Sequence, residues 1–392
     1  MTTAETEFAD VLEAVRGVVP TLRENGRQAE QQRWIPEENL QLLDKAGVFR
    51  LATERRHGGL DASLAQQVEV LAEIARGCPS TGWVSAVWLA SSWVARGHSP
   101  EAKEEIFATP SVRVSGVFSP VPTATLTPVD GGYLLNGTWK FNTGCRGADW
   151  NGMSATLTLP DGTAEEMATI VPISEFEFAD DWHVSSVAAT GSSTTTAKDV
   201  FVPTHRVQKL GVVMAGVESR SQPGRTDRDY SLGEFAVAQA VGVFLGIAQG
   251  ALELFLERLP GRGIAYTAWS KQSEHPYTQI QVGTVAAKIA AARGLSAEVN
   301  DLVQRRADEG VELSVVEKGK VRGDSAYAMQ LTREAVEILY NASGATGIQL
   351  SVPLQRFHRD IQGLSLHGLS LLSTNMEIYG RALLGLDADG AF

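Results

Sequence analysis

Apolar residues with helical spacing dominate the first third of the chain. Near the N-terminus they recur at steps of three and four, as on one face of a helix, at Phe8, Leu12, Val15 and Val19. Further helices are expected over 36–46, with Gly47 as a possible cap, over 64–76, and from about residue 79 onward. The chain is therefore predicted to begin with a helical domain, at 1–111.

The middle of the chain, from about Val112 to Val207, changes to a strand pattern. It is rich in Thr, Gly, Val, Ser and Pro, and residues 131–144 alternate as in a hairpin, with Asn136-Gly137 as the expected turn. Residues 167–173 and 197–203 are typical of further strands. A small β-barrel or sandwich fits this stretch.

Residues 209–233 come next and are charged, contain glycine and lack clear periodicity. We expect them to form a mobile lid and, together with residues 117–125, to determine substrate specificity. With this lid, the central domain is placed at 112–233.

Helical spacing returns after residue 233. Four long segments are expected as helices, and each is long enough for one arm of a bundle, at 234–258, 277–307, 309–341 and 353–384. The last domain is placed at 234–392. The predicted fold class is α+β and multidomain, with an N-terminal α-helical domain, a central β-barrel or sandwich and a C-terminal helical bundle.

Composition and charge exclude several classes of function. The net charge of −12 disfavours a nucleic-acid partner, and two cysteines, Cys78 and Cys145, cannot build a disulfide scaffold or a four-thiolate zinc site. The acidic, amphipathic N-terminus does not resemble a signal peptide. The apolar stretch at 83–95 contains serines and is too short to span a bilayer. We therefore expect a cytoplasmic protein without a membrane or nucleic-acid partner.

The familiar fingerprints of nucleotide, hydrolase and zinc chemistry are missing from the sequence. There is no Gly-x-Gly-x-x-Gly, no Gly-x-x-x-x-Gly-Lys loop, no Gly-x-Ser-x-Gly elbow and no His-Glu-x-x-His pair. The seven histidines include no pair spaced four apart. No metal site is therefore predicted.

One candidate site lies in the last helical segment. On a helix, His367 shares a stripe with Asp360, Gly363, Leu364 and Leu371, and Gly363 and Gly368 would leave space beside the ring. A histidine on an apolar face is costly unless it is hydrogen-bonded. His367 is thus either a general base at a ligand pocket or a satisfied core histidine.

Three other segments combine polar groups with glycine or aromatic residues. A strand that ends in Asn142-Thr143-Gly144 could approach a ligand or simply precede a turn. Trp182 and the Thr190-Gly191-Ser192 loop suit a flat heterocycle, but a Thr-rich strand explains them equally well. Trp83 and Trp88 are five residues apart, so one can face a cavity while Trp88 packs in the core.

The order of these pieces resembles the acyl-CoA dehydrogenase superfold. More narrowly, it is similar to the oxygenase component of two-component, reduced-flavin-dependent monooxygenases, such as hydroxyphenylacetate hydroxylase and the phenol hydroxylase of steroid-ring degradation. The resemblance covers nearly the whole chain. It rests on loose motifs in the same order, at 44–60, 74–83, 131–145, 189–203 and 353–368.

Two departures separate this chain from the dehydrogenase branch. The position of the usual catalytic glutamate is occupied by Leu372, which cannot abstract a proton. Residues 261–277 lack the Arg-x-x-Phe-Gly sequence that helps bind the adenine dinucleotide, which tilts the expectation from FAD toward FMN. The Arg359-Asp360 pair followed by His367 is instead what the hydroxylase branch carries.

The resemblance implies a reaction and its partners. A separate NAD(P)H:flavin reductase would deliver reduced FMN or FAD by diffusion, and a C4a-hydroperoxyflavin formed with O2 would hydroxylate a phenolic or polycyclic aromatic small molecule. A homotetramer is expected, because the last helices of this superfold often complete a neighbouring subunit's flavin site. Oxygenation of nitrogen or sulfur, acyl-CoA dehydrogenation and a non-catalytic binding role remain as alternatives.

The resemblance also implies roles for individual residues. The Thr143 hydroxyl would bond flavin N5, His367 would act as base toward the phenol, and Trp83 would wall the substrate pocket. Asn142 would face flavin or substrate. The remaining expected flavin contacts are Phe141, Trp182, Gly191, Ser192 and, more remotely, Ser119.

Overall fold

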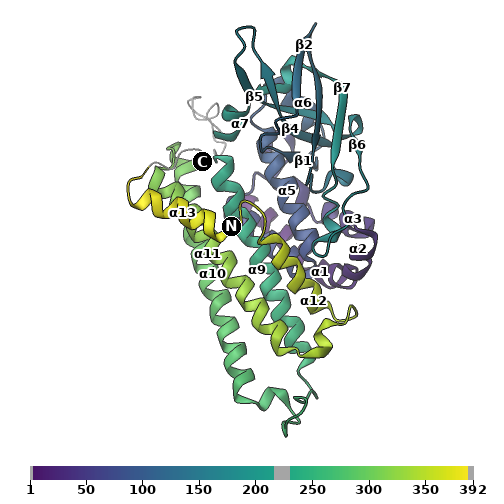
Figure 1. Ribbon diagram of the computed structural model, residues 1–392, viewed down its shortest axis with the longest axis vertical. Helices are drawn as coiled ribbons and strands as arrows, with labels where there is room; N and C mark the ends of the chain where they lie inside the picture. Colours follow the sequence, from purple (N-terminus) through teal and green to yellow (C-terminus); the bar gives the residue numbers. More distant parts are fainter. Residues whose placement is uncertain (1–2, 216–229, 387–392) are drawn as a thin grey trace.

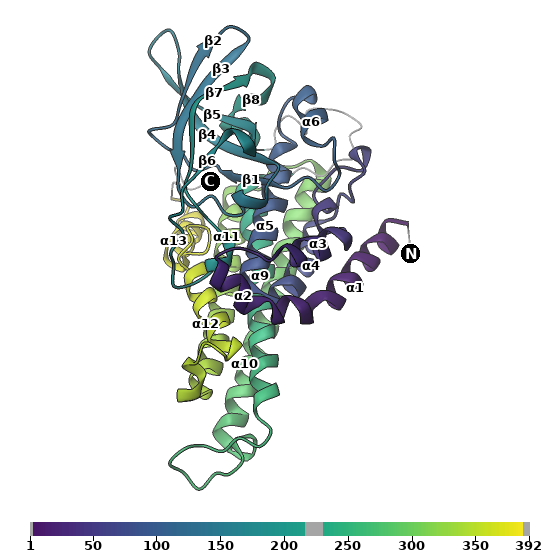
Figure 2. The ribbon, with the colours of Figure 1, turned by 90° about the vertical axis from the view of Figure 1, so that its right-hand side faces the viewer.

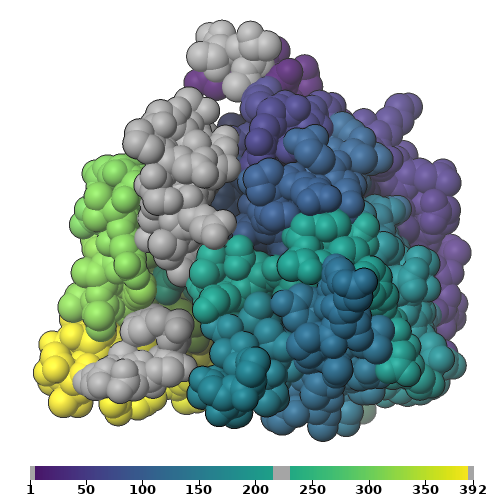
Figure 3. Space-filling model, turned by 90° about the horizontal axis from the view of Figure 1, so that it is seen from above, coloured from purple at the N-terminus to yellow at the C-terminus, as the bar shows by residue number. Residues whose placement is uncertain are grey.

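The computed structural model describes residues 3–215 and 230–386. A β-sheet occupies one end of an elongated molecule, and long helices extend from it along the other end (Figure 1). Viewed from the sheet end, the later helices of the bundle and the N-terminal helices lie on opposite sides of the strands (Figure 3). Of the expected lid at 209–233, residues 216–229 lie outside the described part, while Leu210–Ala215 form helix α7.

Within the described residues, six α-helices precede the sheet. They are α1 (Thr3–Glu24), α2 (Gly26–Gln32), α3 (Glu37–Lys45), α4 (Leu64–Gly77), α5 (Pro79–Ala95) and α6 (Pro100–Ile106). Ser63 caps α4 through a reciprocal capping box with Gln66, and Pro79 starts α5 at a position where the missing N–H costs nothing. The spacing of apolar residues had indicated α1, α3, α4 and α5 to within a few residues, but it did not indicate α2 or α6.

The eight strands belong to one sheet. They are β1 (Val114–Val117), β2 (Thr125–Val129), β3 (Gly132–Trp139), β4 (Trp150–Thr158), β5 (Ala164–Pro172), β6 (Glu177–Phe178), β7 (Thr195–Pro203) and β8 (Val207–Lys209). The strand order is β6-β7-β3-β2-β4-β5-β8, with β1 paired to β4. A buried cluster that includes Trp139 forms the core beneath it.

The expected turn at Asn136-Gly137 is wrong. Both residues lie inside β3, and the register against β7 shifts between Leu135 and Gly137, so the pair marks a β-bulge. The turn from β2 to β3 comes earlier, at Gly131, whose φ of 75° suits glycine. An Asn-Gly pair fits a bulge as well as a turn, and periodicity alone did not separate the two.

The helices after the sheet are α9 (Leu232–Arg258), α10 (Pro276–Glu309), α11 (Val315–Ala342), α12 (Pro353–Leu364) and α13 (Leu372–Leu383). The single helix expected over 353–384 is therefore wrong, because the chain turns between α12 and α13. His367 lies in that turn and not on a helical stripe. The earlier three segments agree with the expected helices apart from their ends.

Helix α9 is the central helix of the bundle. It is long and apolar enough to cross a membrane by length and composition, but 83% of its most apolar window is buried inside the protein. The sequence pattern had pointed only to 83–95 as a long apolar stretch. The apolar side chains of α9 are buried by packing against α4, α5 and α11.

Close packing of α9 on α4 makes Gly246 a sensitive position. A Cβ at Gly246 would lie 2.1 Å from the backbone oxygen of Ala72, whereas no described atom lies within 4 Å of the Cβ position at Gly233. We expect Gly246→Ala to lower the free energy of unfolding by about 2 to 4 kcal/mol, and Gly233→Ala to leave it nearly unchanged. Denaturant unfolding of both variants tests this, and equal stabilities would contradict the packing described.

Candidate active site

Three hydroxyl groups form a buried relay where the end of β3 meets the loop before β7. Thr143 Oγ1 lies 2.7 Å from Ser192 Oγ, which lies 2.7 Å from Thr190 Oγ1, and Thr190 Oγ1 donates to the Val187 backbone oxygen at 2.9 Å. Each hydroxyl has a single proton. Because the Thr190 proton goes to Val187, Ser192 must donate to Thr190, and Thr143 must donate to Ser192.

The direction of the relay determines what Thr143 offers a ligand. Its proton is directed at Ser192, so its remaining lone pairs can accept a hydrogen bond but the hydroxyl cannot donate a second one. Hydrogen bonds in such chains polarise one another, which favours one orientation of all three groups. The relay therefore presents an acceptor at the Thr143 oxygen.

The residue before Thr143 joins the strand end to the rest of the sheet. Asn142 is fully buried, and its Nδ2 donates to Asn151 Oδ1 at 3.0 Å and to Thr195 Oγ1 at 3.1 Å. Its side chain is thus directed into the β-domain and fastens the strand end to β4 and β7. Its Oδ1 has no hydrogen-bond partner among the described residues.

Phe141 and Trp182 form an aromatic pair beside the relay. The two rings meet edge to face, with centroids 6.0 Å apart, and Phe141 is 72% exposed. Phe141 has a φ of 61°, an uncommon backbone conformation for a bulky residue, which occurs where structure or function requires it. Trp182 Nε1 donates to the Val187 oxygen at 3.4 Å. A broad apolar surface is therefore open to a planar ligand.

Helix α5 connects this region to the turn that carries His367. Trp88 is buried, as expected, and its Nε1 donates to the Gly144 oxygen at 3.2 Å. Trp83 lies five residues earlier and contacts the His367 ring edge to face, with centroids 5.2 Å apart. The two tryptophans thus support the relay and the histidine from one rigid helix.

His367 is accessible, and its tautomer is defined by the backbone. The Leu369 N–H donates to His367 Nδ1 at 3.2 Å, so Nδ1 is unprotonated and a neutral ring carries its proton on Nε2. Desolvation of the imidazole by surrounding protein lowers the pKa of His367. At neutral pH the ring is therefore a neutral Nε2–H donor.

Gly363 does not provide the space beside His367 that was expected. A Cβ at this position would lie 2.1 Å from Ser186 Oγ, because α12 packs directly on the loop before β7, while no described atom lies within 4 Å of the Cβ position at Gly368. Ser119 lies exposed after β1, and its backbone oxygen accepts from Ser154 Oγ at 2.7 Å. Among the described contacts, Ser119 does not bond to the relay.

Asp360 is a buried polar residue at this site, which the sequence analysis placed beside His367 without assigning it a role. It is 2% exposed, and its Oδ1 accepts from the Val187 N–H at 2.6 Å. Burial raises the pKa of Asp360 to about 6, against the opposing effect of the Val187 hydrogen bond and of Arg356 and Arg359. The proximity of Asp360 to the histidine in the sequence was a signal, but its partner, 173 residues away, was not visible.

The raised pKa of Asp360 makes stability depend on pH. The folded protein favours the protonated carboxyl, so this contribution is complete below about pH 4 and is lost as the pH rises through about 6, by roughly 3 kcal/mol. We expect Asp360→Asn to remove this decline. Denaturant unfolding of both proteins at several pH values measures it, and an identical decline in the variant would contradict the assignment.

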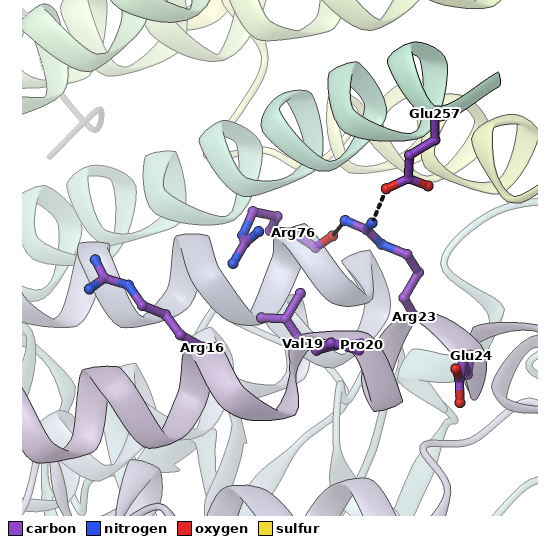
Figure 4. Close-up of a pocket in the computed structure, with 7 residues that line it drawn as sticks. All are labelled: Arg16, Val19, Pro20, Arg23, Glu24, Arg76 and Glu257. Atoms are coloured by element: carbon purple, nitrogen blue, oxygen red, sulfur yellow. Dashed lines mark hydrogen bonds and ion pairs between the residues drawn. The ribbon is translucent and has the colours of Figure 1, made fainter. Parts of the chain in front are cut away.

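A separate surface groove of 490 Å³ lies between α1, α4 and α9 (Figure 4). It is lined by Arg16, Val19, Pro20, Arg23, Glu24, Arg76 and Glu257. Its arginines are ion-paired, for example Arg23 with Glu253 at 2.7 Å and Arg76 with Glu73 at 2.7 Å. This groove contains none of the predicted site residues, and its charges stabilise the packing of the helices.

Comparison with known proteins gives matches along most of the chain. Residues 6–109 match the family model described as "Acyl-CoA dehydrogenase, N-terminal domain", and residues 238–370 match "Acyl-CoA dehydrogenase, C-terminal domain". The chain is 30% identical to the flavin-dependent monooxygenase oxygenase subunit HsaA of Mycobacterium tuberculosis, covering 96% of this chain and 95% of that protein.

Two further proteins have the same extent of similarity. The oxygenase component of an FADH2-dependent resorcinol hydroxylase from a Rhizobium species is 30% identical, over 96% of this chain and 95% of its own length. The structure of XiaF from a Streptomyces species, in complex with FADH2 and glycerol, superimposes with a TM-score of 0.93 at 28% identity, over 98% of each chain.

Proposed function

Because the chain belongs to the acyl-CoA dehydrogenase family, in its branch of oxygenase subunits of two-component flavin-dependent monooxygenases, we propose that it hydroxylates a phenolic or polycyclic aromatic small molecule. The chain is an enzyme of the monooxygenase class, with reduced flavin and O2 as co-substrates. A separate reductase supplies the reduced flavin.

The relay at Thr143 is the observation that carries the proposal. The N5 position of a reduced flavin bears a proton, so it requires a hydrogen-bond acceptor, and the Thr143 oxygen is left as an acceptor by the direction of the relay. Phe141 and Trp182 offer an apolar surface to the flat ring, and Gly191, whose φ of 53° suits glycine, lets the loop that carries Ser192 pack against Trp34. These groups fit a flavin.

When bound, the reduced flavin supplies the two electrons that activate O2. The residues of this chain have three tasks around it. Thr143 holds the proton at N5, and the relay of Ser192 and Thr190 behind it keeps the Thr143 oxygen in the acceptor orientation. Phe141, Trp182 and Trp83 exclude water, which would otherwise promote loss of the oxygen as hydrogen peroxide.

His367 orients the substrate. Its Nε2–H, made available by the Leu369 contact to Nδ1, donates to the oxygen of a substrate bound as its phenolate, whose proton has been released to solvent, and stabilises the negative charge that makes the aromatic ring electron-rich. For Nε2 to accept the phenol proton as a base, a neutral ring would have to carry its own proton on Nδ1, which breaks the bond from Leu369. The geometry therefore favours the hydrogen-bond donor over the general base expected from the sequence.

We further propose FADH2 as the flavin. Two relatives are named with FADH2, the Rhizobium resorcinol hydroxylase and the Streptomyces structure. This departs from the tilt toward FMN that followed from the absence of one arginine motif. A homotetramer and a cytoplasmic location also remain proposals.

Incorporation of isotopic oxygen tests the proposed reaction. The enzyme is supplied with FADH2 by a flavin reductase under ¹⁸O2, with a panel of phenols, matched aromatic amines and aryl sulfides. We expect one labelled atom in a hydroxylated phenol and the other in water. If labelled oxygen appears only in N- or S-oxides, the substrates are amines or sulfides and not phenols. If no product carries the label, the proposed function is contradicted.

A further inference from the structure

The loop of residues 182–192, here called the flavin loop, carries the aromatic and hydroxyl groups of the proposed flavin site. Helix α12 fastens it at three successive residues. Arg359 donates to the Ser185 oxygen, Gly363 lies against Ser186, and Asp360 accepts the Val187 N–H. In Figure 2, α12 lies below the sheet next to α2, where Glu30 pairs with Arg359.

Val187 is the strained residue of the flavin loop. Its φ of 49° and ψ of 31° are left-handed, a conformation that a β-branched residue adopts only when its surroundings enforce it. Both of its backbone groups are held. The N–H donates to Asp360, and the oxygen accepts from the Thr190 N–H, the Thr190 hydroxyl and Trp182 Nε1.

The Val187 oxygen is also the end of the hydroxyl relay. It receives the Thr190 proton, and that bond is what forces Ser192 to donate to Thr190 and Thr143 to donate to Ser192. If Val187 left the left-handed region, its oxygen would turn away. Thr190 could then donate to Ser192 instead, and the direction of the relay would no longer be determined.

The carboxylate of Asp360 is a costly group to keep at this place. Ser80 Oγ lies 3.5 Å from its second oxygen, which is a long contact, and the charged groups around it are Arg356 and Arg359 on α12 and Glu30 on α2. Arg356 is itself buried, with Nε and Nη2 lacking partners among the described residues. A neutral residue of similar size would pack equally well at this position.

We propose that Asp360 is a positioning residue for flavin binding, whose carboxylate holds Val187 left-handed and thereby orients the hydroxyl relay that ends at Thr143. This inference rests on the proposed function, since it assigns to α12 the task of preparing the flavin loop. Asp360 itself touches neither flavin nor substrate. It acts through Val187, Thr190 and Ser192.

Amide hydrogen exchange of the protein without flavin tests the positioning directly. The variants are Asp360→Ala, which loses the acceptor, and Asp360→Asn, which keeps an acceptor oxygen but loses the charge. Asp324→Asn is the matched control, because Asp324 pairs with Lys320 on α11. We expect exchange in residues 182–192 to rise about tenfold in Asp360→Ala, less in Asp360→Asn and not at all in the control.

Flavin affinity supplies the second readout. We expect the Kd for FADH2, measured without oxygen, to rise about tenfold in Asp360→Ala. In the parent protein it should also rise as the pH falls through the titration of Asp360, and this step should be missing in Asp360→Asn. A titration of the flavin itself, or of another residue, would appear in both proteins.

The two measurements test the inference and the proposed function independently of each other. Unchanged exchange in the flavin loop of a folded Asp360→Ala protein would overturn the inference even if the enzyme hydroxylates phenols. If Asp360→Ala does not fold, Asp360→Asn decides, and the same pH step in its FADH2 affinity as in the parent protein would overturn the inference. Failure of the parent protein to bind FAD or FADH2, with the exchange result as expected, would instead contradict the proposed function.

Discussion

Replacing His367 by alanine is expected to slow the hydroxylation of a phenol about a hundredfold, with little change in flavin affinity. The substitution removes the Nε2–H that Leu369 makes available to the phenol oxygen, while the relay at Thr143 and the Phe141–Trp182 pair remain in place. Single-turnover rates with excess phenol, together with the Kd for FAD, measure the two effects separately.

Glutamine at position 367 distinguishes a donor from a base. Its amide can donate from near the position of Nε2 but cannot accept a proton, so we expect His367→Gln to keep more of the rate than His367→Ala. His205→Ala is the matched control, because His205, in the turn before β8, pairs with Glu105 of α6 and contacts none of the relay residues. An unchanged rate in His367→Ala across the pH range would refute the role assigned to His367.

Replacing Thr143 by valine is expected to increase the hydrogen peroxide released per reduced flavin consumed, with flavin reoxidation about tenfold faster. Valine keeps the shape of threonine, removes the acceptor from the relay and leaves Ser192 without its donor. The proton at flavin N5 is then no longer held, and oxygen is lost before the substrate reacts.

A control on the same strand makes this result interpretable. Thr138 also lies on β3 and exchanges a hydrogen bond with Thr196 at 3.2 Å, but it belongs to the sheet rather than to the relay. Thr138→Val should therefore release no more peroxide than the parent protein. Equal peroxide release from all three proteins would show that the Thr143 hydroxyl does not protect the bound oxygen.

The sequence predicted the order of the elements but not the contacts that join them. Apolar spacing located α4 and α9 because burial on one side, or on all sides, determines that spacing. It could not reveal that Thr143 and Ser192 meet across 49 residues, since that contact depends on the pairing of β3 with β7. The resemblance supplied both residues, and the structure supplied the direction of their protons.

The errors have local physical causes. Asn136-Gly137 was predicted as a turn because the same pair permits a bulge, and His367 was placed on a helix because the segment has helical spacing on both sides of the break. The residues around Asp360 in the sequence do not indicate its hydrogen bond to Val187.

The most direct test of the account is the rate at which oxidised-flavin absorbance returns when the protein with anaerobically reduced FADH2 is mixed with oxygenated buffer. The account predicts that the absorbance returns much more slowly with the protein than for free flavin. The return should be faster in Thr143→Val than in the parent protein, and His367→Ala should not change it when no phenol is present. A return as fast with the protein as for the free flavin would contradict its central claim, that this chain binds reduced flavin and protects its reaction with oxygen.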